Sequence, residues 1–389
     1  MSSSTKMWIS ALIASMTSFN FGINLTIHEL SKETLTVTGS NGYLISSRLF
    51  DLFISIFAIS ALVSNLITPF IKLSKKYLLM VIDLLFLLGT FLILYSRCKY
   101  FLFVGRILQG FGFGFIGNSV PVYLSSVSTL DKKGMIGSLH QLFIVFGVLC
   151  GQVLGYLFEN KNYKIPYFIY MGTLAAHLCA LSIIKKTSSQ QNAPSKSLFE
   201  LINKKEARKS LFLATFLHVT QQLSCINGII FFSNSVQDDK SKAKMNTLIG
   251  GGIFVMSTIA AMPFVEKLGR KPMLLLSIFI DSLCLFGVAL TKYTLACLLI
   301  FYVGFSLGLG PIVWSISAEI FPEDYLNAGL ILAVNFNWAL TFAIPYIFKQ
   351  MYEKMGKNAF YFFAIYLIAA FVILLFMFSE TKNRKPAFQ

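Results

Sequence analysis

Long apolar runs follow one another along almost the whole chain. A helix that crosses the roughly 30 Å hydrocarbon core of a bilayer needs about 20 apolar residues, and the sequence holds twelve runs of that kind. The predicted spans are residues 8–27, 43–70, 77–96, 101–124, 136–158, 165–184, 211–234, 246–265, 272–291, 294–320, 327–348 and 358–378. The sequence therefore predicts an all-α membrane protein with twelve transmembrane helices.

The composition excludes an ordinary soluble domain. Of the 389 residues, 56% are hydrophobic and only 13% are charged, whereas a soluble chain coats its surface with about a quarter charged residues. The first run contains Asn20 and Asn24 and has no small-residue cleavage site. We therefore expect this run to be a retained helix whose polar residues face a polar part of the protein interior, rather than a signal peptide.

The net charge of +16, from 33 Lys and Arg against 17 Asp and Glu, raises the question of nucleic acid. The basic residues lie between the apolar runs and form no stripe or RNA-binding motif, so no nucleic-acid partner is expected. The six cysteines have no paired spacing, and His140, His177 and His218 have no ligand-spaced partners. Both residue types are predicted to pack, with no metal site. Since the sequence has no Walker motif, no ATP or other cofactor is expected.

The basic residues are shared unequally between the two sides of the membrane. With an even number of spans both termini lie on one side, and that side carries 19 of the 33 Lys and Arg, against 12 on the other. The positive-inside rule then places both termini and the longest linker in the cytoplasm. We expect a multi-pass protein of the plasma membrane that functions as a monomer.

The two halves of the chain resemble each other when one is shifted by about 200 residues. KLSKKYLLM at 72–80 recurs as KLGRKPMLL at 267–275, and Ile23-Asn24 recurs as Ile226-Asn227. The predicted domains are an N-terminal six-helix bundle over 1–184, a cytoplasmic linker with a short amphipathic helix over 185–210, and a C-terminal six-helix bundle over 211–389. Two such pseudo-repeats are the layout of the major facilitator transporters, whose substrate site lies between the halves.

One stretch carries a more specific likeness. Residues 101–155 read FLFVGRILQGFGFGFIGNSVPVYLSSVSTLDKKGMIGSLHQLFIVFGVLCGQVLG, and they resemble the sugar porter family, in particular the facilitative glucose transporters. The likeness continues in order along the chain with QQLSCIN at 221–227, VEKLGRK at 265–271, GPIVWSISAEIFP at 310–322, FNW at 336–338 and SETKNR at 379–384. It covers essentially the whole chain.

The resemblance implies a site for a neutral, glucose-like hexose. A sugar offers several hydroxyl groups and an apolar face, so its site needs amides and an aromatic plate rather than charges. The positions that match the family's sugar-contacting residues are Gln141, Gln221, Gln222, Asn227, Trp314, Asn337 and Trp338. The alternative is that these amides only bond neighbouring helices, which is worth about 0.6 kcal/mol on average in membranes.

The first span decides between facilitated diffusion and proton symport. A proton-coupled sugar porter is expected to place a carboxylate in span one beside the arginine of span four. Arg106 matches that arginine, but the span-one position is Asn24, and residues 1–28 contain no Asp or Glu. An amide cannot take up a proton, so a uniporter working by alternating access is favoured. Proton-coupled symport through Asp51, Asp83 or Asp281 is the alternative.

A non-transporting sugar sensor is a less favoured alternative, and an enzyme is not expected. A non-transporting sugar sensor would usually carry a long cytoplasmic tail, whereas about ten residues follow the last predicted span. An enzyme is not expected, because the sequence offers no nucleophile with a matched base and no paired catalytic carboxylates at a common depth.

The resemblance also implies a gate of polar and charged residues. Its predicted members are Asn24, Lys75, Lys76, Arg106, Lys133, Glu266, Arg270, Lys271, Glu319 and Glu380. The chain departs from the family at Ser126 and Lys133 in this gate, and at Val255, Ser306 and Phe231-Phe232 around the site. We expect Glu319 to meet Lys75 or Lys76 across the halves, and the glycine-rich stretch before Pro311 to act as a hinge.

Overall fold

The computed structural model describes most of the chain as helix. The described residues are 3–32, 35–36, 45–71, 73–158, 162, 164–184, 196–230, 242–317, 319–322, 324–384 and 388, and they contain no strand. The first part of the predicted linker, 185–195, and the Phe231-Phe232 pair lie outside the described residues.

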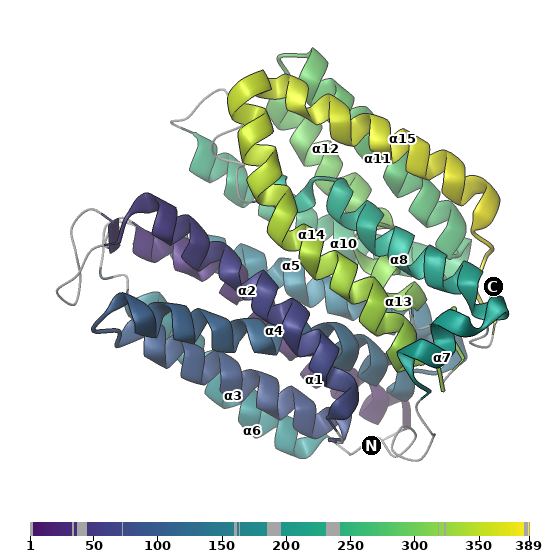
Figure 1. The fold of residues 1–389 in the computed structure, drawn as a ribbon, viewed down its shortest axis with the longest axis horizontal. Helices are drawn as coiled ribbons and strands as arrows, with labels where there is room; N and C mark the ends of the chain where they lie inside the picture. The colour runs from purple at the N-terminus through teal and green to yellow at the C-terminus, as the bar shows by residue number, and fades with distance from the viewer. Residues whose placement is uncertain are drawn as a thin grey trace. The chain divides into compact units, whose positions relative to one another are not determined.

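The first half of the chain forms six long helices (Figure 1). They are α1 (Ser3–Thr26), α2 (Ser47–Ile67), α3 (Lys75–Leu94), α4 (Lys99–Val127), α5 (Lys133–Phe158) and α6 (Lys164–Ile183). A short 3-10 helix, η1 (Ile27–Ser31), continues α1.

The second half begins with a short helix and continues with longer ones. They are α7 (Leu198–Asn203), α8 (Arg208–Leu223), α10 (Ala243–Leu268), α11 (Arg270–Leu290), α12 (Thr294–Leu307), α13 (Pro311–Ser317), α14 (Leu326–Met355) and α15 (Phe360–Met377). The predicted amphipathic helix corresponds to α7, which has only six residues, and its placement at the membrane surface stays a prediction.

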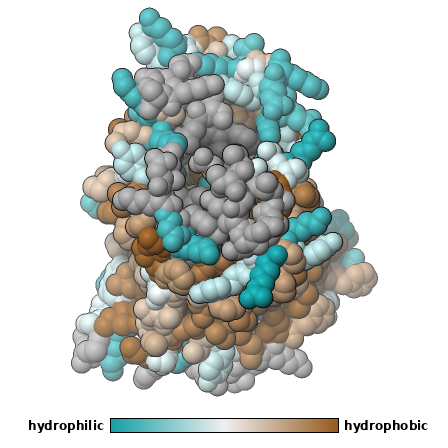
Figure 2. All heavy atoms as spheres, turned by 90° about the vertical axis from the view of Figure 1, so that its left-hand side faces the viewer, coloured by the Kyte–Doolittle hydropathy of each residue, from teal (hydrophilic) through white to brown (hydrophobic). Residues whose placement is uncertain are grey.

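Each of the twelve predicted spans overlaps at least one of these helices, and the span 294–320 includes both α12 and α13. Within the described part of the chain, nine helical stretches are long and apolar enough to cross a membrane, and one of them, Leu326–Met377, holds both α14 and α15. The polar α1 and the 16-residue α8 are not among the nine. Figure 2 shows the exposed surface that these helices produce, with broad hydrophobic areas and the hydrophilic residues gathered mainly toward one end of the view.

The chain divides into two compact units. Unit 1 is Met1–Val127 with Phe143–Asn192, and unit 2 is Ser128–Leu142 with Ala193–Gln389. Helix α5 is therefore shared: its first ten residues belong with unit 2 and the rest with unit 1. The predicted domain division after residue 184 stays a prediction.

In unit 1, α4 packs against both α2 and α3, and α6 packs against α3 and α1. Glycines allow these close approaches. A Cβ atom built on Gly89 of α3 would lie 2.5 Å from the backbone oxygen of Gly105 on α4, and one on Gly105 would lie 2.6 Å from the Gly89 oxygen. Since larger side chains would push the two helices apart, these glycines bring the polar residues of α4 into the interior.

In unit 2, α14 packs against α8, and α11 packs against α12 and α15. The predicted span 211–234 is not one continuous helix. Helix α8 ends at Leu223, Ser224 and Cys225 form a turn, and helix resumes at Ile226. Cys225 has a φ of 67°, which a straight helix does not allow. The sequence missed this break because Cys225 is apolar and carries no turn signal.

Candidate functional site

Four amide side chains of unit 2 form one hydrogen-bonded cluster, the amide cluster. Gln221 and Gln222 lie in the last turn of α8, Asn227 follows the break, and Asn337 comes from α14. Gln222 Nε2 donates to Asn337 Oδ1 at 3.0 Å, and Asn227 Nδ2 donates to Gln222 Oε1 at 2.6 Å. Asn337 Nδ2 donates to Gln221 Oε1 at 2.9 Å. The turn at Cys225 therefore brings Asn227 back onto Gln222, which spacing along a straight helix would not predict.

A histidine extends the amide cluster. Asn337 Nδ2 lies 3.2 Å from His218 Nδ1, and His218 Nε2 lies 3.2 Å from Ser317 Oγ. An amide nitrogen can only donate, so Nδ1 is the acceptor and the neutral imidazole carries its proton on Nε2. His218 is fully buried and fixes Asn337 from a second side.

The ring of Trp314 on α13 contacts two imidazoles. The ring centroids of His140 and Trp314 are 5.3 Å apart at 82°, and those of His218 and Trp314 are 4.9 Å apart at 81°. Both are edge-to-face arrangements, which aromatic pairs prefer. The sequence predicted that these histidines pack, and they do so against the predicted aromatic plate, which the sequence could not anticipate.

The break between α12 and α13 supplies backbone acceptors to this region. Helix α12 ends at Leu307, and α13 begins at Pro311. The freed oxygen of Leu309 accepts a hydrogen bond from Gln221 Nε2 at 2.7 Å. A Cβ built on Gly310 would lie 3.2 Å from Gln141 Cγ, so Gln141 lies directly against this break. Trp338, the last predicted site residue, is buried on α14 beside Asn337.

Unit 1 places a charged side chain at its centre. Arg106 of α4 is fully buried and donates through Nη1 to Asn24 Oδ1 at 2.6 Å and to Gln109 Oε1 at 3.2 Å. Its Nη2 donates to the Ile54 backbone oxygen at 3.2 Å, and its guanidinium lies 4.6 Å from the centre of the Phe57 ring. The charge is therefore met by neutral acceptors and an aromatic face.

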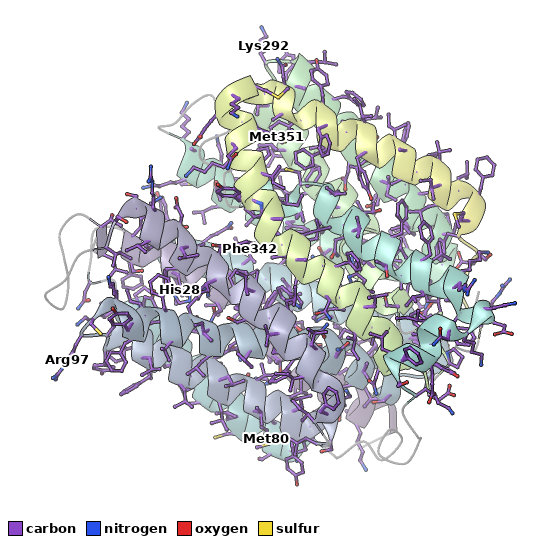
Figure 3. The ribbon with its side chains drawn as sticks, in the orientation of Figure 1. His28, Met80, Arg97, Lys292, Phe342 and Met351 are labelled. Carbon is purple, nitrogen blue, oxygen red and sulfur yellow. The ribbon has the colours of Figure 1, made fainter. Side chains whose placement is uncertain are left out.

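The Asn24 amide is shared with a histidine and a tyrosine. His28, labelled in Figure 3, has its Nε2 3.3 Å from Asn24 Oδ1 and its Nδ1 3.0 Å from Tyr167 Oη. Asn24 Nδ2 donates to Tyr170 Oη at 3.2 Å. Asn24 thus joins Arg106 to two tyrosines of α6, as neutral partners of a buried charge must be oriented by further hydrogen bonds.

The predicted gate residues of unit 2 form a compact ion cluster. Arg270 Nη2 lies 2.9 Å from Glu319 Oε1, and Arg270 Nη1 lies 3.3 Å from Glu266 Oε2. The Met135 backbone N–H of α5 donates to Glu266 Oε1 at 2.8 Å, and Thr381 Oγ1 donates to Glu319 Oε2 at 2.6 Å. The cluster therefore ties the start of α5 and the segment after α15 to α10 and α11.

Glu380 caps the start of α11. Gly269 has a φ of 95°, and the following backbone N–H groups of Arg270 and Lys271 each donate to the Glu380 carboxylate at 3.0 Å. Burial opposes ionisation of this carboxyl, but the N–H donors of Arg270, Lys382, Lys271 and Thr381 outweigh it and hold its pKa below the usual value. The carboxylate also lies at the positive end of the α11 dipole.

The predicted gate lysines lie elsewhere. In unit 1, Lys75 Nζ donates to the Asn118 oxygen at 3.3 Å and Lys76 Nζ donates to the Ser182 oxygen at 2.7 Å. In unit 2, Lys133 is the first residue of α5, and Lys271 Nζ donates to the Leu375 oxygen at 2.8 Å. The contact of Glu319 with Lys75 or Lys76 would join the two units, and it stays a prediction.

Comparison with known proteins assigns the sequence to a family. Residues 6–183 and 171–386 each match the family described as "Sugar (and other) transporter", one copy in each half. The chain belongs to this family. Among its relatives is hexose transporter 1 of Plasmodium yoelii yoelii, which is 25% identical over an alignment of 454 residues. The alignment covers 96% of this chain and 89% of that protein. The facilitated glucose transporter member 2 of Sus scrofa is 25% identical over 396 residues, covering 86% and 75%.

A solved structure shows the fold. The proton:xylose symporter XylE, bound to 6-bromo-6-deoxy-D-glucose, superposes with a TM-score of 0.84 at 16% identity, covering 99% of this chain and 98% of that one. The chain therefore has the major facilitator fold, as the sequence predicted, and nine helical stretches among its described residues are long and apolar enough to cross a membrane.

The structure also reveals a polar group of this sugar transporter that sequence reasoning did not assemble. Asp83 of α3 and His177 of α6 form a buried pair, with 2.5 Å between Asp83 Oδ2 and His177 Nδ1, and Asn20 of α1 contacts both. The sequence noted Asp83 as an intramembrane carboxylate and His177 as a packing residue. They are 94 positions apart, so no local spacing could have joined them; the signal was only that each is polar within an apolar run.

Proposed function

We propose that this protein carries a neutral, glucose-like hexose across a membrane by alternating access, as a uniporter. The observation that carries the proposal is the amide cluster of Gln221, Gln222, Asn227 and Asn337, which lies with Trp314 in the interior of unit 2. Every member of that cluster is uncharged, so it can exchange hydrogen bonds with sugar hydroxyls without desolvating an ion.

The four amides form hydrogen bonds with one another that a transient ligand can replace. Each carboxamide offers an acceptor oxygen and two donor hydrogens, and the bonds among the four side chains can be replaced one by one by hydroxyl groups. Trp314, held edge-on by two histidines, supplies a rigid apolar surface for the C–H face of a sugar ring. Such a site binds through many neutral contacts, each worth about 1 kcal/mol.

The surroundings of Arg106 support uniport over proton coupling. The partner of Arg106 on α1 is the amide of Asn24, at 2.6 Å, and an amide neither gains nor loses a proton at physiological pH. From Trp8 to Thr26, α1 contains no titratable side chain. The charge of Arg106 therefore has no carboxylate on α1 that could release it during a transport cycle.

The test is uptake of labelled D-glucose and L-glucose into proteoliposomes, with and without an inward proton gradient. We expect D-glucose to equilibrate faster than L-glucose and the proton gradient to leave the final level unchanged. Equal rates for the two enantiomers, or no uptake of either, would overturn the hexose proposal. Competition by other hexoses and deoxysugars in the same assay identifies the preferred sugar, which the departures at Val255 and Ser306 leave open.

A proton-driven symporter is the second candidate, because unit 1 contains the buried Asp83–His177 pair. In that case the inward proton gradient drives sugar above its equilibrium level. The same liposomes decide between the two candidates, since accumulation and equilibration differ in the final level and not only in the rate.

We further propose a plasma membrane protein with both termini in the cytoplasm, acting as a monomer, without a cofactor, a nucleic-acid partner or catalytic activity. The uneven distribution of 19 and 12 basic residues supports the orientation. Fusion of a small tag to either end of the chain and accessibility to a membrane-impermeant label test it. Labelling of an end in intact cells would reverse the orientation.

A further inference from the structure

The Asp83–His177 pair lies at the junction of three helices of unit 1. Asp83 comes from α3, His177 from α6 and Asn20 from α1, and the exposed fraction of each side chain is 3% or less. Asn20 Nδ2 donates to Asp83 Oδ1 at 3.4 Å and lies 3.2 Å from His177 Nδ1. Neither the sugar-contacting positions nor the ion cluster of unit 2 includes any of these residues.

The hydrogen bonds of His177 fix where its protons lie. Its Nε2 is 2.8 Å from the backbone oxygen of Ile13, which can only accept, so Nε2 carries a hydrogen. Its Nδ1 is 2.5 Å from Asp83 Oδ2. Two lone pairs at that distance would repel each other, so a second proton must lie between Nδ1 and Oδ2, on one atom or the other.

That proton belongs to the pair rather than to either residue. With it, the pair is neutral overall, whether written as carboxylate and imidazolium or as carboxylic acid and imidazole. Without it, the pair carries one negative charge in a membrane interior, where an unpaired charge is costly. The geometry of the three helices is therefore compatible with the protonated pair only.

The other charged and titratable groups around the pair have other partners and do not neutralise its negative charge when the proton is lost. Arg106 on α4 is directed to Asn24, Gln109 and the Ile54 oxygen. Tyr170 on α6 donates to the Asn20 backbone oxygen at 3.0 Å. On α3 itself, Lys75 and Lys76 donate to backbone oxygens of α4 and α6, and α1 contributes no titratable side chain between Trp8 and Thr26.

We propose that Asp83 and His177 form a proton-binding site whose single shared proton must be bound for this carrier to transport sugar. The proposal rests on the proposed function for its transport readout only. The site is linked to Arg106 through α1, because Tyr170 donates to the Asn20 oxygen and accepts from Asn24 Nδ2, and Asn24 accepts from Arg106. Loss of the proton separates α3 from α6 and displaces the α1 segment that carries Asn20 and Asn24.

The proton stays in place during the cycle and is not carried with the sugar. Both members of the pair and Asn20 belong to the same compact unit, and no acidic partner on α1 changes its contact with Arg106. The expected effect is therefore on the rate in both directions equally. Sugar exchange slows as the pH rises on both sides of the membrane, by about tenfold for each pH unit above the midpoint of a single-proton titration.

The test compares Asp83→Asn with a matched control, Asp281→Asn. In Asp83→Asn the amide nitrogen can donate to His177 Nδ1 permanently, so we expect transport to be retained and to lose its pH dependence. Asp281 is a buried carboxyl on α11, the helix equivalent to α3, and its substitution should leave the wild-type pH profile unchanged. The measurement is equilibrium exchange of labelled sugar across about pH 5 to 9, with equal pH on both sides.

Three results would overturn the proposal. The first is a pH profile of transport in Asp83→Asn that equals the wild-type profile. The second is a loss of pH dependence in Asp281→Asn as well. The third is that the wild-type protein accumulates sugar under a proton gradient and that Asp83→Asn abolishes this accumulation. The last result would mean that the proton is transported.

A second measurement keeps the site testable if no sugar is transported. The thermal unfolding midpoint of the purified protein should fall as the pH rises through the titration of the pair, and this fall should be absent in Asp83→Asn. If the unfolding midpoints of wild type and Asp83→Asn change with pH in the same way, the proposed proton-binding site is wrong. Such a result would not bear on the proposed function, whose own test is stereoselective uptake.

Discussion

The two units differ in how they handle polar groups in their interiors. Unit 1 buries charged or titratable side chains, Arg106 and the Asp83–His177 pair, and surrounds them with amides and tyrosines. Unit 2 also buries titratable side chains, His140, His218 and Asp281, but its ion pairs lie at helix ends around Arg270, and its interior holds a cluster of four neutral amides. In unit 1 the buried charge of Arg106 joins α1, α2 and α4, whereas the exchange of hydrogen bonds between the unit 2 amides and a sugar is part of the proposed function.

Equivalent helices make the contrast sharper. The repeated segments at 72–80 and 267–275 put α3 and α11 in register, so that Asp83 and Asp281 lie about one turn apart on matching helices. Asp83 has partners from α1 and α6. Neither carboxyl oxygen of Asp281 has a hydrogen-bond partner among the described residues. An aspartate in the interior of unit 1 is therefore paired with a histidine, whereas the aspartate on the equivalent helix of unit 2 has no hydrogen-bond partner among the described residues.

The largest expected effect comes from removing the central charge of unit 1. Arg106→Gln cannot reach Asn24, Gln109 and the Ile54 oxygen together, and each buried acceptor left without a donor costs about 1 to 3 kcal/mol. We expect a strong loss of both transport and thermal stability. Arg97→Gln, at an exposed position, is the matched control. Wild-type stability in Arg106→Gln would contradict the view that this charge organises unit 1.

A smaller and more selective effect is expected in the amide cluster. Asn337→Ala removes the acceptor of Gln222 and the donor to Gln221, at a cost of about 1 to 3 kcal/mol, or about a tenfold to hundredfold loss of sugar affinity. Competition binding of sugar to the purified protein measures it. The exposed Asn358→Ala is the control. If Asn337→Ala lowers stability as much as Arg106→Gln but leaves affinity unchanged, the amides serve only to bond helices.

The ion cluster of unit 2 should matter for conformation more than for affinity. Glu319→Gln weakens the contacts with Arg270 and Thr381 and shifts the balance between the two access states by its differential energy. We expect a change of a few-fold in the ratio of the maximal influx rate to the maximal efflux rate, about 1 kcal/mol, at unchanged equilibrium level. The exposed Glu353→Gln serves as control. Unchanged rates would remove Glu319 from the gate.

The smallest effect is expected at Glu380, which stabilises one helix end. Glu380→Gln keeps the shape but loses the charge at the start of α11, and a lost cap costs about 1 kcal/mol. Because the folded-state pKa of this carboxyl lies below its usual value, its contribution is present at neutral pH and is lost as the pH falls through that lowered pKa. The wild-type unfolding temperature should therefore exceed that of Glu380→Gln at neutral pH. In acid the two unfolding temperatures should become equal.

Much of the fold could be predicted from the sequence because lipid imposes simple rules. Apolar runs of fixed length located the helices, and ordered motifs pointed to the family, which the comparisons confirmed. The amides of α8 were singled out because they match the family's sugar-contacting positions, and their role in binding stays a prediction. What failed was the continuity of 211–234, because the break at Cys225 depends on backbone geometry and not on a sequence signal.

The sequence by itself determined which segments are long and apolar enough to cross a membrane and which family the chain belongs to, because hydropathy and motif order are properties of the linear chain. Only the tertiary structure decided which polar groups meet. His177 reaches Asp83, His218 reaches Asn337, and Arg106 finds an amide in place of a carboxylate. A hydrogen bond depends on atoms within about 3 Å, and such proximity between distant residues arises from the packing of helices rather than from the order of residues along them.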